Sequence, residues 1–293
     1  MKATLVTITE AHAGQRIDNF LICRLKGVPK SRIYKAIRKG EVRVDGGRVK
    51  QTQRLRLGQT VRVPPIQLAE KPFQMPPSAR WEQAMRANII YQDPDVLVVN
   101  KPAGMAVHAG TGIERGLIEN IKASPTYGET WELVHRIDRE TSGLLVLAKR
   151  GKVLKELQEQ FRQREVKKGY LLWVKGAWQG GEQVVDQPLL RYEGGNGERR
   201  VKVDRLGQSA KTVFKPLRVL GDRSLLWAAP ETGRTHQIRV HAAFLGHPIL
   251  GDRKYGDNIT SSERMFLHAA QLVFAGSAAK WNLCACLGAV WSD

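Results

Sequence analysis

The sequence predicts an α+β protein built from two domains. Its 293 residues are enough for two domains, or for one large domain with an appendage. A proline-rich stretch interrupts the chain, and beyond it short β-like runs outnumber helical segments without the regular alternation of βαβ units. We therefore expect an N-terminal domain at 1–66, a linker at 67–82, and a domain at 83–293 with a mixed, mostly antiparallel sheet.

The N-terminal domain holds more than half of the net positive charge. The whole chain has 47 Lys and Arg against 28 Asp and Glu, a formal net charge of +19. Residues 15–64 contain fourteen of these cations and only three acidic residues. Such an excess favours a polyanionic partner. Nucleic acid fits better than a membrane surface, because no basic amphipathic helix with large apolar anchors is present.

Two helices, a hairpin and a final strand are expected within this basic stretch. The first helix is RIDNFLICRLK at 16–26, whose apolar residues share one face: Ile17, Phe20, Leu21 and Leu25. The second, at 28–40, has Gly40 where a C-cap belongs. EVRVDGGRV at 41–49 predicts a hairpin, and GQTVRV at 58–63 a strand.

The second helix carries the cations that we expect to bind nucleic acid: Lys30, Arg32, Lys35, Arg38 and Lys39. Cations grouped on one helix contact phosphates and do not read bases. This stretch resembles an S4 RNA-binding domain, which implies that it binds RNA. A solvated charged face unrelated to RNA is the alternative.

The larger domain shows six β-like runs and two helical segments. The runs lie at 88–92, 96–101, 144–149, 169–176, 211–220 and 224–231, and the helical segments at 154–164 and 236–246. Residues 89–110 form a strand pair whose tight turn is Asp93-Pro94-Asp95, followed by a glycine-containing loop.

Cysteine usage and hydropathy indicate a cytoplasmic protein. Cys23, Cys284 and Cys286 form neither a disulfide framework nor a CxxC pair, so we expect free thiols. The longest apolar run, GLLVLA at 143–148, is too short to cross a bilayer, and the N-terminus lacks the apolar core of a secretory signal. We expect no membrane association, and we expect a monomer.

Asp138, in HRIDRETSGLLVLAK at 135–149, is the candidate catalytic group. It lies between Arg136 and Arg139, which we expect to keep it ionised. An ionised carboxylate in a closed pocket can attack a carbon centre or remove a proton. A glycosidase-like pair with Glu140 is disfavoured, because two residues along an extended segment it would face the opposite way. From these residues alone, an ordinary structural ion pair stays the alternative.

Motifs for cofactors and metals are absent from the sequence. It contains no Walker loop, no dinucleotide-binding glycine pattern, no GxSxG and no HExxH. His236, His241 and His247 are spaced five and six apart, so they do not share one helical face. Packed or hydrogen-bonded histidines are favoured over a metal site. We expect no cofactor and no metal.

Four segments in this order resemble the RluA-type pseudouridine synthases. They are 89–110, 135–149, KKGYLLWVKG at 167–176, and ETGRTHQIRVHAAFLGHPILGDRKYG at 231–256. The resemblance implies an isomerase that converts uridine to pseudouridine without a cofactor. It is greatest to members that act on large-subunit ribosomal RNA, so the expected partner is that RNA or an assembly intermediate containing it.

The resemblance also implies roles for individual residues. Asp138 matches the catalytic aspartate, which acts on the C1′/C2′ region of the ribose and frees the uracil to rotate and rejoin through C5. Tyr170 matches the tyrosine that stacks on the uracil and takes part in proton transfer at C5. Arg239 matches the arginine paired with the catalytic carboxylate.

Three further residues are expected to bind the substrate. Arg136 matches the arginine that enters the RNA stack where the target base has left, Ile238 matches the apolar wall beneath the base, and His135 precedes them in the same pocket. Ile137 and Glu140 replace the commoner Leu and Asp of the motif. The C-terminal segment GSAAKWNLCACLGAVWSD, at 276–293, departs from the family pattern.

Two other functions stay open at this point. One is a non-catalytic RNA-binding or ribosome-assembly protein that has kept the fold. The presence of Asp138, Tyr170 and Arg239 together argues against it. The other is a related synthase that acts on transfer RNA or on small-subunit RNA, and the S4-like stretch only mildly favours ribosomal RNA over these.

Overall fold

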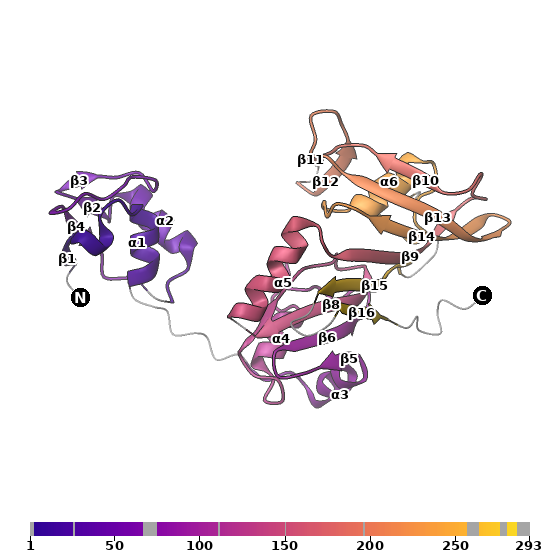
Figure 1. Cartoon of the computed structure of the whole chain (residues 1–293), viewed down its shortest axis with the longest axis horizontal. Helices are drawn as coiled ribbons and strands as arrows, with labels where there is room; N and C mark the ends of the chain where they lie inside the picture. Colours follow the sequence, from indigo (N-terminus) through magenta and orange to yellow (C-terminus); the bar gives the residue numbers. More distant parts are fainter. Residues whose placement is uncertain are drawn as a thin grey trace. The chain divides into compact units, whose positions relative to one another are not determined.

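The structure, a computed structural model, describes residues 3–25, 27–66, 75–110, 112–149, 151–195, 197–256, 264–275 and 280–285. The chain divides into two compact units, Met1–Gln74 and Met75–Asp293 (Figure 1). Each unit has its own apolar core. No helix in the described ranges is long and apolar enough to cross a membrane.

The N-terminal unit is a four-stranded antiparallel sheet with two helices. The strand order is β1 (Thr4–Thr7), β4 (Thr60–Val63), β2 (Arg43–Val44) and β3 (Gly47–Arg48). A 3-10 turn, η1 (Glu10–His12), precedes α1 (Ile17–Arg24) and α2 (Lys30–Lys39). The helices and hairpin expected from the sequence are confirmed.

Apolar periodicity explains how these two helices pack. The buried residues of both helices meet in one core: Ile17, Phe20 and Leu21 from α1 with Ile33, Ala36 and Ile37 from α2. Gly40 ends α2 with a φ of 71°, a left-handed conformation that glycine adopts without strain. The cations of α2 are left on its outer surface.

Regular structure begins before the expected end of the linker. Residues 67–74, half of the segment 67–82, lie outside the described residues. The Ser78 side chain accepts a hydrogen bond from the Trp81 N–H at 3.2 Å and caps α3 (Ala79–Ala87). Residues 79–82 were therefore wrongly assigned to the linker. The prolines of this segment suggested irregular structure, and the helix cap at Ser78 was overlooked.

The second unit is built on a ten-stranded sheet (Figure 1). Its main path is β10 (Gln183–Asp186), β13 (Lys211–Leu220), β14 (Arg223–Pro230), β9 (Lys167–Lys175), β15 (Leu267–Ala275), β8 (Ser142–Lys149), β6 (Val96–Lys101) and β5 (Ile89–Gln92). Beside this path, β7 (Trp131–Leu133) pairs with β8, and β16 (Lys280–Cys284) pairs with β15. Among the described strands only β8 and β15 run parallel, so the mixed, mostly antiparallel sheet is confirmed.

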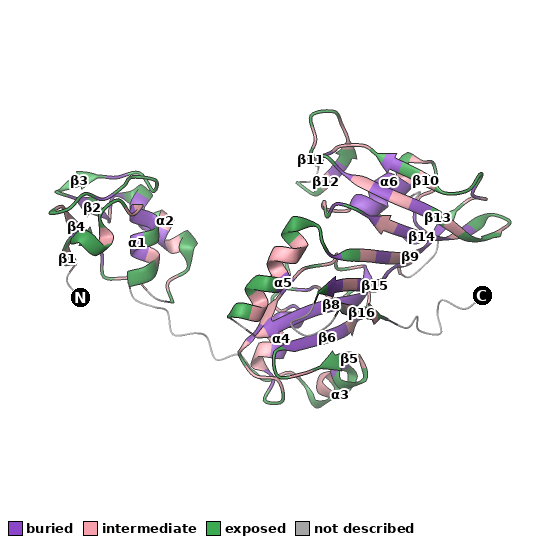
Figure 2. Ribbon diagram, viewed as in Figure 1, coloured by how far each residue is buried: buried purple, intermediate pink, exposed green. Residues whose placement is uncertain are grey.

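Strands β6 and β8 are buried on both faces (Figure 2). Leu144 and Val146 pack on the side of α5 (Lys152–Gln163), whereas Leu145 and Leu147 pack on the side of α4 (Leu117–Ala123). Side chains alternate between the faces of a strand, so a strand covered on both sides reads as a continuous apolar run. This explains the sequence LLVLA in β8.

The other end of the sheet carries α6 (Gln237–Phe244) and a separate two-stranded hairpin. This hairpin consists of β11 (Leu189–Glu193) and β12 (Arg199–Val203). Leu189 and Val201 of the hairpin share a small apolar cluster with Val240 of α6, against which Tyr255 also packs. The hairpin is therefore held beside α6.

The predicted tight turn and part of the C-terminal segment are also described. Asp93 Oδ1 accepts the backbone N–H groups of Asp95 at 2.7 Å and Val96 at 2.6 Å, which closes the turn between β5 and β6. In the C-terminal segment, β16 extends the sheet beside β15. Residues 276–279 and 286–293, including Cys286, lie outside the described residues.

Candidate active site

A pocket of about 430 Å³ lies between the Asp138 loop, the start of β9, α5 and the start of α6. All six side chains expected at the catalytic site line it: His135, Arg136, Asp138, Tyr170, Ile238 and Arg239. Asp138 is the one acidic residue in this lining, and the lining cations are Arg136, Arg162, Arg164, Lys168, Arg234 and Arg239. The pocket thus offers a single carboxylate within a basic rim.

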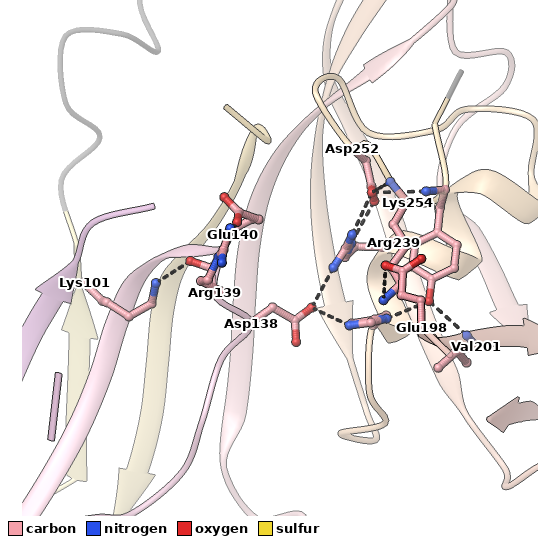
Figure 3. A network of polar contacts seen from close by, with 11 residues as sticks. Lys101, Asp138, Arg139, Glu140, Glu198, Val201, Arg239, Asp252 and Lys254 are labelled. Carbon is pink, nitrogen blue, oxygen red and sulfur yellow. Dashed lines mark hydrogen bonds and ion pairs between the residues drawn. The ribbon is translucent and has the colours of Figure 1, made fainter. Parts of the chain in front are cut away.

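Asp138 is bound by a guanidinium that is remote in the sequence. Nη1 of Arg239, on α6, is 3.3 Å from Oδ2 of Asp138, and the Asp138 side chain is 25% exposed. The flanking arginine Arg139 instead pairs with Glu140 at 2.7 Å (Figure 3). The expectation that the neighbouring arginines hold Asp138 is therefore wrong for Arg139, because adjacent side chains in this loop point in different directions.

Arg239 is itself held by a second carboxylate. Its Nε and Nη2 donate to Asp252 at 2.8 and 2.7 Å, a bidentate pair, and the Asp252 side chain is fully buried (Figure 3). Burial lowers the pKa of Arg239, but its hydrogen bonds and the charges of Asp252 and Asp138 outweigh this and raise it. Arg239 is thus a fixed cation whose remaining nitrogen faces Asp138.

Asp252 is oriented by the turn in which it lies. Its Oδ1 also accepts the backbone N–H groups of Lys254 at 2.9 Å and Tyr255 at 3.2 Å. Burial raises the pKa of Asp252, but Arg239 and these N–H groups together lower it by more, so the net shift is downward. Asp252 lies in the GDRKYG segment at 251–256, where no local pattern indicates its role.

Lys101, at the end of β6, ties the Asp138 loop to the sheet. This buried side chain donates to the carbonyls of Pro102 at 2.9 Å, Met105 at 2.8 Å and Arg139 at 2.9 Å. Burial lowers the pKa of Lys101 to about 7, against the opposing charges of Glu140 and Asp138. Three carbonyl acceptors match the three hydrogens of an ammonium group. Lys101, like Asp252, was missed because its role depends on a contact that only folding creates, here with the carbonyl of Arg139.

A close approach of β8 and β15 sets the position of the loop that precedes β8. Gly143 has a φ of 107°, and a side chain there would collide with the backbone of Ala269. The neighbouring Ser142 Oγ lies 2.9 Å from Nδ1 of His268 on β15. Glycine is required at this point because only it combines that conformation with such contact.

Tyr170 lies in β9 between Ala228 of β14 and Ala269 of β15. The preceding residue is Gly169, where any side chain would collide with the ring of Trp227. Burial, and secondarily the charge of Asp138, raise the pKa of Tyr170 above its usual range. At neutral pH its ring is therefore an uncharged phenol, which suits stacking against a base.

His135 makes structural contacts in addition to lining the pocket. Its Nε2 accepts a hydrogen bond from the Val146 N–H at 3.1 Å, and its ring stacks on Phe161 with centroids 4.5 Å apart. Burial, followed by the charge of Lys168, lowers the pKa of His135 to about 3. The imidazole is neutral at pH 7 and forms a rigid wall of the pocket.

The three histidines weighed as metal ligands make separate contacts. His236 Nδ1 lies 2.6 Å from the Tyr255 hydroxyl, His241 Nδ1 lies 2.9 Å from Thr212 Oγ1, and His247 Nδ1 lies 2.8 Å from the Lys175 carbonyl oxygen. Within the described ranges, no three His, Cys, Asp or Glu side chains are grouped so that they could hold a metal ion.

In the N-terminal unit, four of the five predicted RNA-binding cations are exposed on α2: Lys30, Lys35, Arg38 and Lys39. Arg32 is partly buried and pairs with Glu41 at 2.9 Å. The exposed four are free to approach phosphates, whereas the charge of Arg32 is partly compensated within the unit.

Comparison with known proteins agrees with this geometry. Residues 95–244 match the RNA pseudouridylate synthase family, and residues 15–61 match the S4 domain family. A domain that matches this synthase family, preceded by an S4 domain, identifies the class of protein as an RNA-modifying isomerase. The chain belongs to the RNA pseudouridylate synthase family.

Similar sequences span nearly the whole chain. A protein of Haemophilus influenzae named ribosomal large subunit pseudouridine synthase C is 44% identical over 279 residues, which cover 92% of this chain and 86% of that protein. The protein of the same name from Escherichia coli strain K12 is 45% identical over 280 residues, covering 92% of this chain and 88% of its own.

Solved structures share the fold. Human RNA pseudouridylate synthase domain containing 1 superposes with a TM-score of 0.59 at 26% identity, covering 68% of this chain and 82% of the human one. Human RNA pseudouridylate synthase domain containing 4 gives a TM-score of 0.59 at 28% identity, covering 72% and 93% of the two chains.

Proposed function

We propose that this protein isomerises specific uridines to pseudouridine in large-subunit ribosomal RNA, with Asp138 as the catalytic carboxylate. The observation that carries the proposal is the contact of Asp138 with Arg239, a buried cation that Asp252 holds by two hydrogen bonds on its other side. Relatives that share 44–46% of their residues with this chain bear the name ribosomal large subunit pseudouridine synthase C. That name supports the choice of RNA.

The chemistry requires a confined pocket and no net exchange of atoms. The bond from C1′ to N1 of uracil breaks, the base turns within the pocket, and a bond from C1′ to C5 forms. C5 loses a proton and N1 gains one. Asp138 either attacks C1′ and forms an ester that breaks when C5 bonds to C1′, or removes a proton at C2′ and returns it when that bond forms. A volume of about 430 Å³ is that of an ordinary small-ligand site, and it suits one nucleotide flipped out of the RNA.

Tyr170 and Ile238 then hold the detached base. An aromatic face binds uracil without directional hydrogen bonds, so the base can rotate against the Tyr170 ring. Ile238 is 7% exposed and supplies an apolar surface. Arg136, which is exposed at the pocket, occupies the space that the flipped base leaves in the RNA stack.

RNA affinity is divided between the two units in this proposal. The exposed cations of α2 contact phosphates, which makes binding dependent on salt, and the basic rim of the pocket orients the strand that carries the target uridine. The proposal includes action as a monomer. The protein acts in the cytoplasm, on ribosomal RNA or on an assembly intermediate.

The non-catalytic alternative is disfavoured by the preserved site. A protein that only binds RNA would not need Asp138 to be held by a buried arginine, because burying charged pairs costs free energy. A substrate other than large-subunit RNA is disfavoured by the names of the similar proteins.

The test is to map pseudouridines on total RNA in cells with and without this gene, by chemical marking and reverse transcription. The proposal predicts that particular large-subunit positions lose the modification and regain it on complementation with the wild-type gene. Loss confined to transfer RNA or small-subunit RNA would contradict the choice of substrate, and an unchanged map would contradict the activity.

A further inference from the structure

His236 faces the catalytic carboxylate from the same helical turn as Arg239. It is the N-cap residue of α6, three positions before Arg239, so that the two residues lie on neighbouring sides of one turn. Its Nε2 lies 3.9 Å from Oδ2 of Asp138, the oxygen that Arg239 contacts at 3.3 Å. Oδ1 of Asp138 has no hydrogen-bond partner among the described residues.

The other side of the imidazole is fixed by Tyr255. The Tyr255 hydroxyl accepts the backbone N–H of Val201, in strand β12 of the hairpin, at 3.0 Å. Its own hydrogen can then be donated to Nδ1 of His236, only 2.6 Å away. Because Nδ1 accepts, the single proton of a neutral ring resides on Nε2 and faces Asp138.

Burial keeps this ring neutral. The His236 side chain is 15% exposed, and desolvation lowers its pKa to about 4. The charges that face it act in both directions: Asp138 and Asp252 favour the protonated ring, whereas Arg239 and Lys254 disfavour it. Burial likewise raises the pKa of Tyr255 to about 12, so its hydroxyl keeps the hydrogen that it donates.

The backbone at this position is also unusual. His236 has a φ of 53°, in the left-handed region that few residues other than glycine occupy. Such conformations persist where the surroundings determine them, and they cluster at active sites. Here the conformation brings the ring between Tyr255 and Asp138.

We propose that His236 is a positioning residue for Asp138, which closes its Nε2–H onto Oδ2 in the RNA complex and thereby leaves Oδ1 as the reacting oxygen. With Arg239 and His236 both on Oδ2, the carboxylate can no longer rotate, and Oδ1 points at the nucleotide. The hairpin takes part through Val201, whose N–H donates to the Tyr255 hydroxyl and orients it. The inference rests on the proposed function of the same pocket.

The test compares single-turnover pseudouridine formation, with enzyme saturating over an unmodified large-subunit ribosomal RNA transcript, for four chains. His236→Ala is expected to lower the rate about 10- to 100-fold, since a misplaced reacting group costs that much, while RNA affinity changes less than about threefold. His236→Gln can donate from its amide nitrogen and is expected to recover most of the rate. His108→Ala, exposed and outside the pocket, is the control and keeps the wild-type rate.

Imidazole nitrogen NMR of the wild-type protein shows directly which nitrogen of the His236 ring carries the proton. At pH 7 the inference predicts a neutral His236 with the proton on Nε2, and Tyr255→Phe should allow the Nδ1–H form to appear. This spectrum decides the question even where His236→Ala does not fold: a wild-type proton on Nδ1 overturns the inference.

The kinetic outcomes separate the inference from the proposed function. An active wild-type chain with an equally fast His236→Ala variant overturns the inference and leaves the function standing. A reduced rate that His236→Gln does not restore assigns a structural role and also overturns it. A wild-type chain that makes no pseudouridine overturns the proposed function, and the inference falls with it.

Discussion

Asp138 and Arg239 are 101 residues apart in the sequence, yet Nη1 of Arg239 lies 3.3 Å from Oδ2 of Asp138. The contact joins the loop before β8 to the first turn of α6. It places a carboxylate beside a fixed cation inside the pocket, which is the arrangement that the proposed isomerisation needs.

Asp252→Asn should destabilise the second unit by about 3–5 kcal/mol, because it removes one partner of a buried ion pair and leaves the Arg239 charge uncompensated on that side. Turnover should fall as well, since Arg239 loses its orientation. Urea unfolding followed by tryptophan fluorescence measures the stability. All seven tryptophans lie after residue 74, so the signal reports this unit alone.

The matched control for Asp252→Asn is Glu156→Gln, which breaks an exposed pair with Lys152 at 3.7 Å on α5. Surface pairs contribute roughly 0–1 kcal/mol, so this variant should unfold almost as the wild type does. Equal losses from both variants would show that Asp252 has no special part in holding Arg239.

Tyr170→Phe should keep most of the activity, and Tyr170→Ala should lose about 1–3 kcal/mol of transition-state stabilisation if the ring acts by stacking on the base. The raised pKa of Tyr170 supports this order, because an uncharged phenol is a poor proton acceptor. Single-turnover rates of the two variants decide it. Equal loss in both would assign the essential role to the hydroxyl group.

A triple variant of α2, Lys35→Ala with Arg38→Ala and Lys39→Ala, should weaken RNA binding and flatten its dependence on salt. Each lost phosphate contact lowers the slope of log affinity against log salt by about 0.7–0.9. Binding titrations at several salt concentrations give the slope. Ser31→Ala, an exposed neutral change on the same helix, is the control. A slope equal to that of the wild type would show that these α2 cations do not contact the RNA phosphates.

The second unit should lose stability as the pH falls from about 6.5 towards about 4. Burial lowers the pKa of His135 to about 3 and those of His236 and His268 to about 4, below the ordinary value of 6.5. The unfolded chain therefore takes up protons at a higher pH than the folded chain does. The stability present above pH 6.5 is lost on acidification, and each histidine contributes a loss of up to about 1.4 kcal/mol per pH unit.

Urea unfolding at several pH values measures this dependence. His268→Gln should make the slope shallower by one histidine's share, because glutamine does not titrate. A free energy of unfolding that stays constant between pH 7 and 4.5 would contradict the burial of these rings.

Local patterns were sufficient to predict most strands and helices of this fold. The apolar run in β8 and the Asp93 turn depend on neighbouring residues, so the sequence alone indicates them. The cap at Ser78 was missed since prolines surround it. Asp252 and Lys101 were also missed, because their roles come from partners brought together only by folding: Asp252 binds Arg239, and Lys101 binds the carbonyl of Arg139.

The candidate site was predictable to a different extent. Six of the residues that line the pocket were expected at the site from the resemblance of four motifs to a known family, and the structure brings these six to one cavity. The cation beside Asp138 was assigned from local sequence to its neighbours, and this was wrong for Arg139. Proximity in sequence does not determine which guanidinium a side chain faces, since the loop directs Arg139 to Glu140.

Replacing Asp138 with Asn tests the central claim most directly, because it removes the charge and keeps the size of the side chain. We expect Asp138→Asn to form no measurable pseudouridine on a large-subunit RNA transcript that the wild type modifies, while its RNA affinity stays within about tenfold, since most of the affinity comes from phosphate contacts elsewhere. Turnover by Asp138→Asn at a rate comparable to the wild type would contradict the account.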